Sequence, residues 1–112
     1  FPNFFFMYLY KNNLFEPSPF GPPSSSGVYM VVVIDPESNR KRICYIGSSK
    51  NIKERVSNNT HPYMKLFNRL QNKTVITISA CMIDGYRELE IEMINHFRPL
   101  LNKHHKPKHR NE

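Results

Sequence analysis

The sequence predicts a small α/β fold in which helices flank a mainly antiparallel, three-stranded sheet. Residues 27–34 (GVYMVVVI) and 41–47 (KRICYIG) are rich in β-branched and aromatic side chains, which favour strands. The DPESN stretch between them is typical of a turn, so the two strands are expected to form a hairpin. Residues 74–83 (TVITISACMI) predict a third strand, and the helical pattern of residues 86–97 follows it and ends before Pro99.

Two further helices are expected between the second and third strands. KNIKERV, residues 50–56, predicts a short helix with Ser48 or Ser49 as its cap. The NNT stretch ends this helix. HPYMKLFNRLQ, residues 61–71, predicts the next one, because Pro62 is tolerated in a first helical turn. The expected order is therefore strand, strand, helix, helix, strand, helix.

The chain divides into three parts by composition. Residues 1–26 join an aromatic stretch to a Pro/Ser-rich one, which predicts an arm: an anchor docked on the domain or on a partner, then an extended linker. Residues 27–102 carry the strand and helix signals and are expected to form the domain. Residues 103–112 form a basic tail that is expected to fray. A chain of 112 residues can build one core but not a second independent unit.

The charge balance favours a polyanionic partner. The chain has 16 Lys and Arg residues against 9 Asp and Glu, a formal net charge of +7 at pH 7. Nucleic acid is the first partner that such a charge suits, and an anionic membrane surface is the second. A basic surface that only keeps the protein soluble is as compatible with the charge alone.

The cysteines and the apolar runs favour an intracellular protein. Cys44 and Cys81 both lie in predicted strands, where reduced core thiols are expected rather than a disulfide. No apolar run reaches the roughly 18 residues of a membrane span. The FFFMYLY stretch, residues 4–10, is too short and lacks the basic leader of a signal peptide. A cytoplasmic location is expected, which for a phage-encoded protein is the host cytoplasm.

One carboxylate of the predicted helix at residues 86–97 falls on its apolar side. At about 100° per residue, Glu88 and Glu92 lie opposite the apolar arc, whereas Glu90 lies near its middle. Burying an unpaired carboxylate is unfavourable, so Glu90 is expected either to form an ion pair or to bind a metal ion. The apolar arc consists of Tyr86, Leu89, Met93, Ile94 and Phe97. The candidate ion-pair partners are Arg55, Arg87 and Arg98.

The order of these features resembles the GIY-YIG nuclease family. Gly27-Val28-Tyr29 and Tyr45-Ile46-Gly47 are similar to the two halves of the family signature, one on each strand of the predicted hairpin. Arg55 stands ten residues after Tyr45, where the family places an arginine on its first helix. Glu90, Pro99 and Asn102 resemble the family's glutamate and its P-x-x-N ending. The resemblance covers residues 27–102 and leaves the arm and the tail unexplained.

The resemblance implies a metal-dependent endonuclease that hydrolyses phosphodiester bonds of DNA. Glu90 would be the one side-chain ligand of Mg²⁺ or Mn²⁺, whose remaining ligands are water and phosphate oxygens. Arg55 would bind the scissile phosphate through its fork of donors. Tyr45 would act as general base through its phenolate or a bridging water, with Tyr29 hydrogen-bonded beside it. Without the resemblance, Arg55 is a surface arginine and the tyrosines are a cross-strand aromatic pair.

Other residues receive supporting roles from the same resemblance. The amide of Asn102 is expected to tie the C-terminal loop to the site. His61 would contact phosphate or assist proton transfer, although a helix cap or a surface position explains it as well. Ser48 follows YIG where some family members have lysine, so Lys50 is expected to contact the phosphate instead. Ser48, Lys50 and Lys53 are the expected substrate-binding residues.

Several functions remain open. A site-specific, restriction-like homodimer that cuts both strands is the first, and a nicking domain of a phage or mobile-element homing nuclease is close to it. Repair-type incision comes third. A catalytically inactive nucleic-acid-binding module of the same fold is the rival from another class. A membrane-surface protein that uses FFFMYLY and the basic tail is the least favoured, so no membrane partner is expected.

Overall fold

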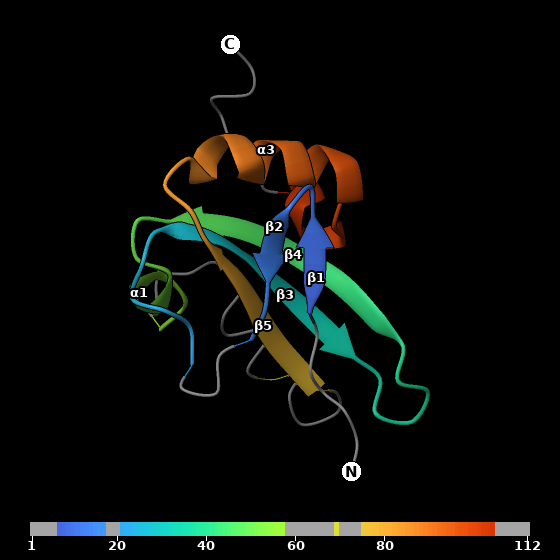
Figure 1. Cartoon of the computed structure of the whole chain (residues 1–112). Coiled ribbons are helices and arrows are strands. Elements are labelled where there is room, and N and C mark those ends of the chain that lie inside the picture. The colour runs from blue at the N-terminus through green and yellow to red at the C-terminus, as the bar shows by residue number, and fades with distance from the viewer. Residues whose placement is uncertain (1–6, 18–20, 58–68, 70–74, 105–112) are drawn as a thin grey trace.

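The computed structural model describes residues 7–17, 21–57, 69 and 75–104 (Figure 1). Of the predicted helix at residues 61–71, only Arg69 lies in this part of the chain. His61 lies outside it, as does the tail from residue 105 onward.

The central sheet is antiparallel, with β3 (Gly27–Ile34) between β4 (Lys41–Ser49) and β5 (Val75–Met82). The predicted three-stranded antiparallel sheet is thus confirmed. β4 continues through Ser48 and Ser49, beyond its expected end, because β3 begins at Gly27 and supplies pairing partners for both serines. The turn between β3 and β4 closes through the hydrogen bond from the Asp35 N–H to the Arg40 carbonyl, 2.9 Å long.

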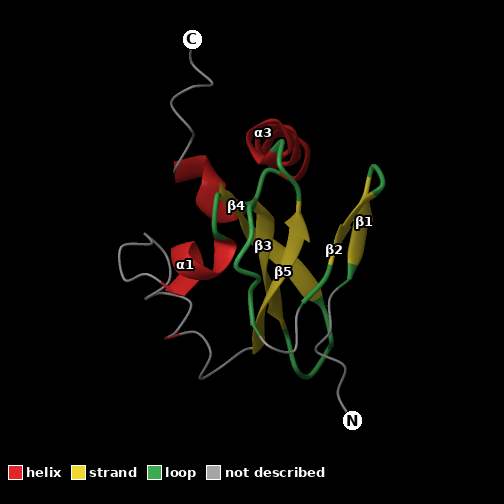
Figure 2. Ribbon diagram, turned by 60° about the vertical axis from the view of Figure 1, so that its left-hand side comes forward, coloured by secondary structure: helices red, strands yellow, loops and turns green. Residues whose placement is uncertain are grey.

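The two faces of the sheet bury different residues. Alternate residues of β3 from Val28 to Ile34 pack against the last helix, whereas Tyr29 and Val31 pack on the opposite face against the first helix. The pairing of β3 with β4 shifts between Val31 and Val32, so Cys44 has no partner in the register. The α/β core therefore has one layer on each side of the sheet, as Figure 2 shows.

The first helix, α1 (Ile52–Ser57), begins two residues later than expected. The Asn51 side-chain oxygen accepts a hydrogen bond from the Glu54 N–H at 3.1 Å, which makes Asn51 the cap of the helix. The predicted caps, Ser48 and Ser49, are therefore wrong. The Ser49 hydroxyl accepts instead from the Asn51 N–H at 3.0 Å, and this bond shapes the turn that precedes the helix.

The last helix, α3 (Tyr86–Phe97), has the predicted bounds. It ends at Arg98, which adopts a left-handed conformation with φ 49° and donates its N–H to the Ile94 carbonyl at 2.8 Å. Pro99 follows and η1 (Leu100–His104) forms a short 3-10 helix. Leu89, Met93 and Ile94 are buried on the sheet side of α3. The predicted apolar face is confirmed at these residues.

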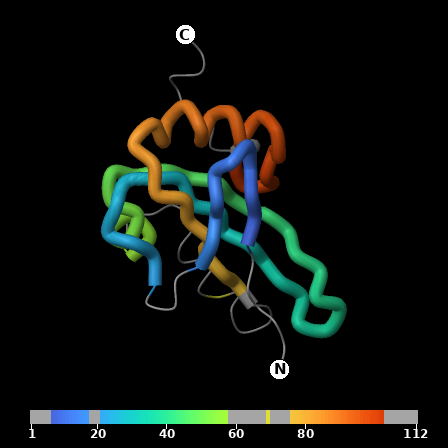
Figure 3. Tube along the Cα trace, in the orientation of Figure 1, coloured from blue at the N-terminus to red at the C-terminus, as the bar shows by residue number. Residues whose placement is uncertain are grey.

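A β-hairpin precedes the sheet, in the region where the sequence predicted an arm without strands. β1 (Tyr8–Tyr10) and β2 (Asn13–Phe15) are joined by Lys11 and Asn12, both with positive φ, as a tight hairpin turn requires. Tyr10 and Phe15 are buried in the core on the α3 side of the sheet. Figure 3 shows the hairpin lying beside α3 and across the sheet.

Contacts with β5 and α3 hold this hairpin in place. Glu16 exchanges two backbone hydrogen bonds with Ala80 of β5, at 3.2 and 3.0 Å. The Tyr10 hydroxyl and the Lys11 ammonium both reach Glu92 of α3, at 2.8 and 2.7 Å. Glu92 is exposed, as expected. Its contacts with Tyr10 and Lys11 also join the hairpin to the helix.

The Pro/Ser-rich segment that the sequence predicted as a linker contacts α1. The carbonyls of Pro23 and Ser25 accept hydrogen bonds from the N–H groups of Lys53 and Ile52, at 3.0 and 2.9 Å. These donors have no partner inside the helix, so the segment satisfies them. Within the described residues, no helix is long and apolar enough to cross a membrane.

Candidate active site

Two tyrosines of neighbouring strands lie together on the α1 face of the sheet. Tyr29 of β3 pairs with Gly47 of β4, and Tyr45 precedes Gly47 by two residues, so the tyrosines are diagonal cross-strand neighbours. Their ring centroids are 6.2 Å apart and their planes are inclined by 43°. Tyr29 is 1% exposed and Tyr45 is 4% exposed. The predicted pair is therefore a buried contact.

The glycines of the two motifs have steric reasons to be glycine. A Cβ added at Gly47 would lie 2.5 Å from the Tyr29 hydroxyl oxygen and 2.6 Å from Cζ, which means that the phenol ring lies directly across Gly47. A Cβ added at Gly27 would overlap the carbonyl of Cys81 on β5 and would lie 3.0 Å from Cδ1 of Ile52. Gly27 thus lets β3, β5 and α1 approach closely, and Gly47 makes room for Tyr29.

Arg55 and Glu90 both act electrostatically on Tyr29. Burial raises the pKa of the Tyr29 phenol far above its usual value of 10.0, and Tyr45 and Glu90 raise this pKa further. The Arg55 guanidinium opposes them by lowering the Tyr29 pKa through its charge and a hydrogen bond. Burial has the largest effect, so Tyr29 is a neutral phenol at neutral pH. Side chains from β4, α1 and α3 thus all influence the Tyr29 hydroxyl of β3.

The carboxylate of Glu90 is held by Ser48. The Ser48 hydroxyl donates to Glu90 Oε1 at 2.6 Å, which joins the end of β4 to α3. Glu90 is half-buried, unlike the exposed Glu88 and Glu92 on the same helix. The helical spacing placed Glu90 on the inward side correctly, but it gave no sign that Ser48 would be its partner.

Asn102 is attached to the strand that carries Tyr45. Its side-chain oxygen accepts from the Ile46 N–H at 2.8 Å, and its amide nitrogen donates to the Ile46 carbonyl at 2.9 Å. Among the described strands, β4 is at the edge of the sheet, so none of them pairs with Ile46 on this side, and Asn102 takes the place of a strand there. Asn102 is 3% exposed. These two hydrogen bonds connect η1 to β4.

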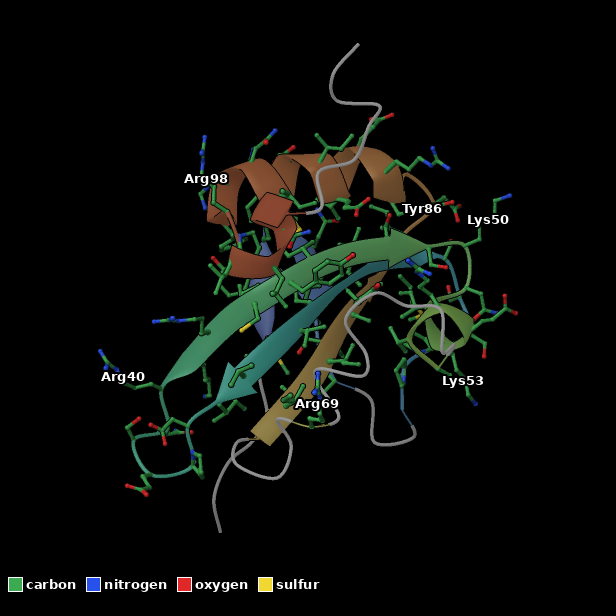
Figure 4. All side chains as sticks on the ribbon, turned by 180° about the vertical axis from the view of Figure 1, so that it is seen from behind. Arg40, Lys50, Lys53, Arg69, Tyr86 and Arg98 are labelled. Atoms are coloured by element: carbon green, nitrogen blue, oxygen red, sulfur yellow. The ribbon has the colours of Figure 1, made fainter. Side chains whose placement is uncertain are left out.

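The remaining predicted residues lie around the rim. Lys50 follows the end of β4 and Lys53 lies on α1, both exposed, and Figure 4 shows them pointing outward near that end of the sheet. Arg55 is half-buried between the exposed surface of α1 and Tyr29. The candidate site therefore combines a buried phenol pair with exposed lysines beside it.

The donor set suits a hard cation that keeps most of its water. In the described part of the chain, no three His, Cys, Asp or Glu side chains lie close enough to hold a metal ion together. Glu90 is a single carboxylate whose Oε1 is already oriented by a hydroxyl group. One carboxylate is sufficient for Mg²⁺ when waters and substrate phosphates complete its shell. Mg²⁺ or Mn²⁺ at Glu90 therefore fits the residues present, whereas an all-protein metal cage does not.

Comparisons with known proteins identify no relative: no protein-family model matches the chain, and neither the curated proteins nor the solved structures contain a significant match.

Proposed function

We propose that the chain is a metal-dependent DNA endonuclease of the GIY-YIG type, which hydrolyses a phosphodiester bond at the Tyr29–Tyr45 site. The observation that carries the proposal is a buried pair of phenols, the first of which feels the charges of both an arginine and a carboxylate. Such groups meet the needs of phosphodiester hydrolysis: proton transfer, phosphate binding and stabilisation of charge. A pair of tyrosines that only packed would not require either charge.

The arrangement supports a distinct role for each side chain. Arg55 binds the scissile phosphate, because its guanidinium presents several donors in one plane. Tyr45 acts as the general base, directly or through a water. Tyr29 remains protonated because its pKa is raised, so its role is to donate a hydrogen bond to the phosphate or to the attacking water. Lys50 and Lys53 attract the flanking phosphates.

Glu90 holds the divalent cation, and Ser48 fixes the orientation of its carboxylate. A cation bound there supplies positive charge for the phosphate and for the leaving oxygen. Asn102 keeps β4, and with it Tyr45, at a fixed position relative to η1.

Cleavage of supercoiled plasmid tests the proposal. The wild-type chain should nick or linearise the plasmid with Mg²⁺ or Mn²⁺ and should lose this activity with EDTA. Glu90→Ala should abolish cleavage while duplex binding persists. Glu88→Ala removes an exposed carboxylate from the same helix and should cleave at the wild-type rate.

Two outcomes contradict the proposal in different ways. Cleavage by Glu90→Ala at the wild-type rate would remove the metal assignment. Binding of DNA by the wild type without cleavage in either metal would favour the inactive nucleic-acid-binding module. If cleavage occurs, the ends of the products report the mode of action: a defined motif with a fixed stagger indicates a restriction-like homodimer, and single nicks indicate a monomer.

A further inference from the structure

A second basic surface lies on the same face of the sheet as the tyrosines. It is an open groove of about 600 Å³, which we name the β4 groove. Its lining consists of Val33, Asp35, Arg40, Lys41, Arg42, Cys44 and Leu100. Figure 4 shows that Arg40 and Lys50 lie at opposite ends of β4, so the groove begins where the strand begins and the tyrosine site lies toward its end.

The register places the groove and the tyrosines on one face. Arg42 pairs with Val33, which follows Val31 by two residues on β3. Val31 packs with Tyr29 and Tyr45. Because side chains alternate along a strand, Arg42 and Val33 point to the same side of the sheet as Val31 and the two phenols. One surface therefore runs from Arg42 to the candidate site without crossing an edge of the sheet.

The β4 groove has an excess of positive charge. Arg40, Lys41 and Arg42 are exposed, and no carboxylate of the described residues forms an ion pair with them. Among the described residues of the lining, Asp35 is the one that is acidic. The Asp35 carboxylate accepts from the Glu37 N–H at 2.9 Å, and this backbone hydrogen bond is the main reason that the Asp35 pKa is low. Asp35 therefore stays ionised and also interacts with the Arg40 charge, so the lining has three cations against one anion and keeps a net positive charge for a polyanion.

The groove lies close to the tyrosine site along β4. Arg42 precedes Tyr45 by three residues, and strand residues advance by roughly 3.3 Å. One duplex that lies along β4 can therefore contact both the groove and the tyrosine site.

We propose that the β4 groove is a second phosphate-binding site, which holds the backbone of duplex DNA beside the bond at the tyrosine site. The position of the cleaved bond rests on the proposed function, whereas binding in the groove does not require cleavage. Arg40 and Arg42 contact the phosphates, and the apolar side chain of Leu100 forms one wall of the groove. The groove thereby orients the duplex along β4.

Binding of a fluorescent duplex in EDTA, measured by anisotropy at several salt concentrations, tests the groove without cleavage. Each phosphate contact contributes about 0.9 to the slope of log K against log[salt], which corresponds to roughly eight-fold in affinity at about 0.1 M salt. Arg42→Ala should therefore bind the duplex roughly eight-fold more weakly at about 0.1 M salt, and its salt slope should be smaller by about 0.9. Arg42→Lys keeps the charge and should retain most of the affinity and of the slope.

Lys11→Ala is the matched control, because it also removes one positive charge but lies on the hairpin of the opposite face. It should bind like the wild type. An Arg42→Ala variant with the affinity and salt slope of Lys11→Ala would overturn the proposal, and so would a wild-type chain that does not bind duplex DNA.

Cys44 provides an independent probe inside the groove. It is half-exposed, whereas Cys81 is 7% exposed, so Cys44 is the more accessible thiol. Burial raises the pKa of the Cys44 thiol, and alkylation is best followed at mildly alkaline pH by mass spectrometry. Saturating duplex should slow the alkylation of Cys44 several-fold, and an unchanged rate would overturn the proposal.

The nuclease assignment and the β4 groove can be refuted independently of each other. If Arg42→Ala loses affinity but the wild type cleaves no DNA with Mg²⁺ or Mn²⁺, the groove stands and the nuclease assignment falls. If the wild type cleaves and Arg42→Ala binds normally, the nuclease assignment stands and the groove falls.

Discussion

The phenol ring of Tyr29 lies directly across the α-carbon of Gly47, on the neighbouring strand. A methyl group at Gly47 would approach the Tyr29 hydroxyl oxygen to 2.5 Å. Tyr29 is fully buried, so its ring has little space into which it can retreat. The absence of a side chain at Gly47 therefore determines where the Tyr29 hydroxyl lies relative to Tyr45, Arg55 and Glu90.

Gly47→Ala tests this relationship. The added methyl should displace the Tyr29 ring and destabilise the fold by about 1–3 kcal/mol, the usual range for overpacking. Cleavage should fall by roughly 100-fold, because a misplacement of about 1 Å has this effect on a reacting site. Cleavage assays and urea denaturation measure the two effects.

Gly85→Ala is the control for this change. Gly85 precedes α3 with φ −80°, and an added Cβ would meet no atom within 4 Å. The variant should remain close to the wild type in both assays. Equal activity of the two alanine variants would show that the position of the Tyr29 ring does not control the reaction.

Ser48→Ala removes the hydroxyl that donates to Glu90 Oε1. A carboxylate that loses such a partner binds its metal more weakly, typically by 10-fold to 100-fold. We expect the Mg²⁺ concentration for half-maximal cleavage to rise by at least about 10-fold, with a smaller change at saturating Mg²⁺. Ser48→Thr keeps a hydroxyl group and should restore the metal affinity. An unchanged Mg²⁺ dependence in Ser48→Ala would separate Ser48 from the cation.

Tyr29→Phe tests whether the Tyr29 phenol is neutral in the folded chain and donates a hydrogen bond in the reaction. The folded chain holds the Tyr29 pKa above the ordinary 10.0, so the stability that the neutral phenol contributes is present below pH 10.0 and is lost as the pH rises above it. The urea midpoint of the wild type should therefore fall more steeply above pH 10.0 than that of Tyr29→Phe. Cleavage by the variant should fall by roughly 100-fold through the loss of one hydrogen-bond donor.

Tyr86→Phe removes the hydroxyl of a half-buried tyrosine on α3 and should cleave like the wild type. A Tyr29→Phe variant with the same alkaline profile as the wild type would show that Tyr29 titrates normally in the folded chain.

Asn102→Ala removes both side-chain hydrogen bonds to the backbone of Ile46. A buried backbone group without a partner is destabilising by about 1–3 kcal/mol, so this variant should lose at least about 2 kcal/mol in urea denaturation. The Ile46 amide should also exchange its hydrogen faster. Leu100→Ala, at an exposed position of the same 3-10 helix, should lose less than about 1 kcal/mol. Equal losses would mean that Asn102 does not anchor the edge of β4.

Local patterns were sufficient for the sheet and the last helix. β3 and α3 have the predicted bounds, because each combines a clear apolar periodicity with a strong end signal, the turn after Ile34 and Pro99 after α3. Helical geometry also predicted that Glu90 lies on the inward side. The predicted cap of α1 was wrong. Several polar residues precede the helix, and only the folded chain shows that Asn51 is the one that accepts from the Glu54 N–H.

Contacts between distant residues were not predictable in the same way. The hairpin of β1 and β2 has a tight turn formed by Lys11 and Asn12, without the glycine that usually marks one. Its burial depends on Glu92 and β5, which lie far along the chain. The Ser48–Glu90 bond likewise joins residues that are 42 positions apart.

The sequence by itself determined that β3, β4, β5, α1 and α3 form and which side of α3 carries a carboxylate inward, because periodicity and turn chemistry act between near neighbours. Only the tertiary structure decided that Tyr29 crosses Gly47, that Ser48 holds Glu90 and that Arg42 shares a face with the phenols. These relationships depend on strand register and packing, which bring together residues that no local preference connects.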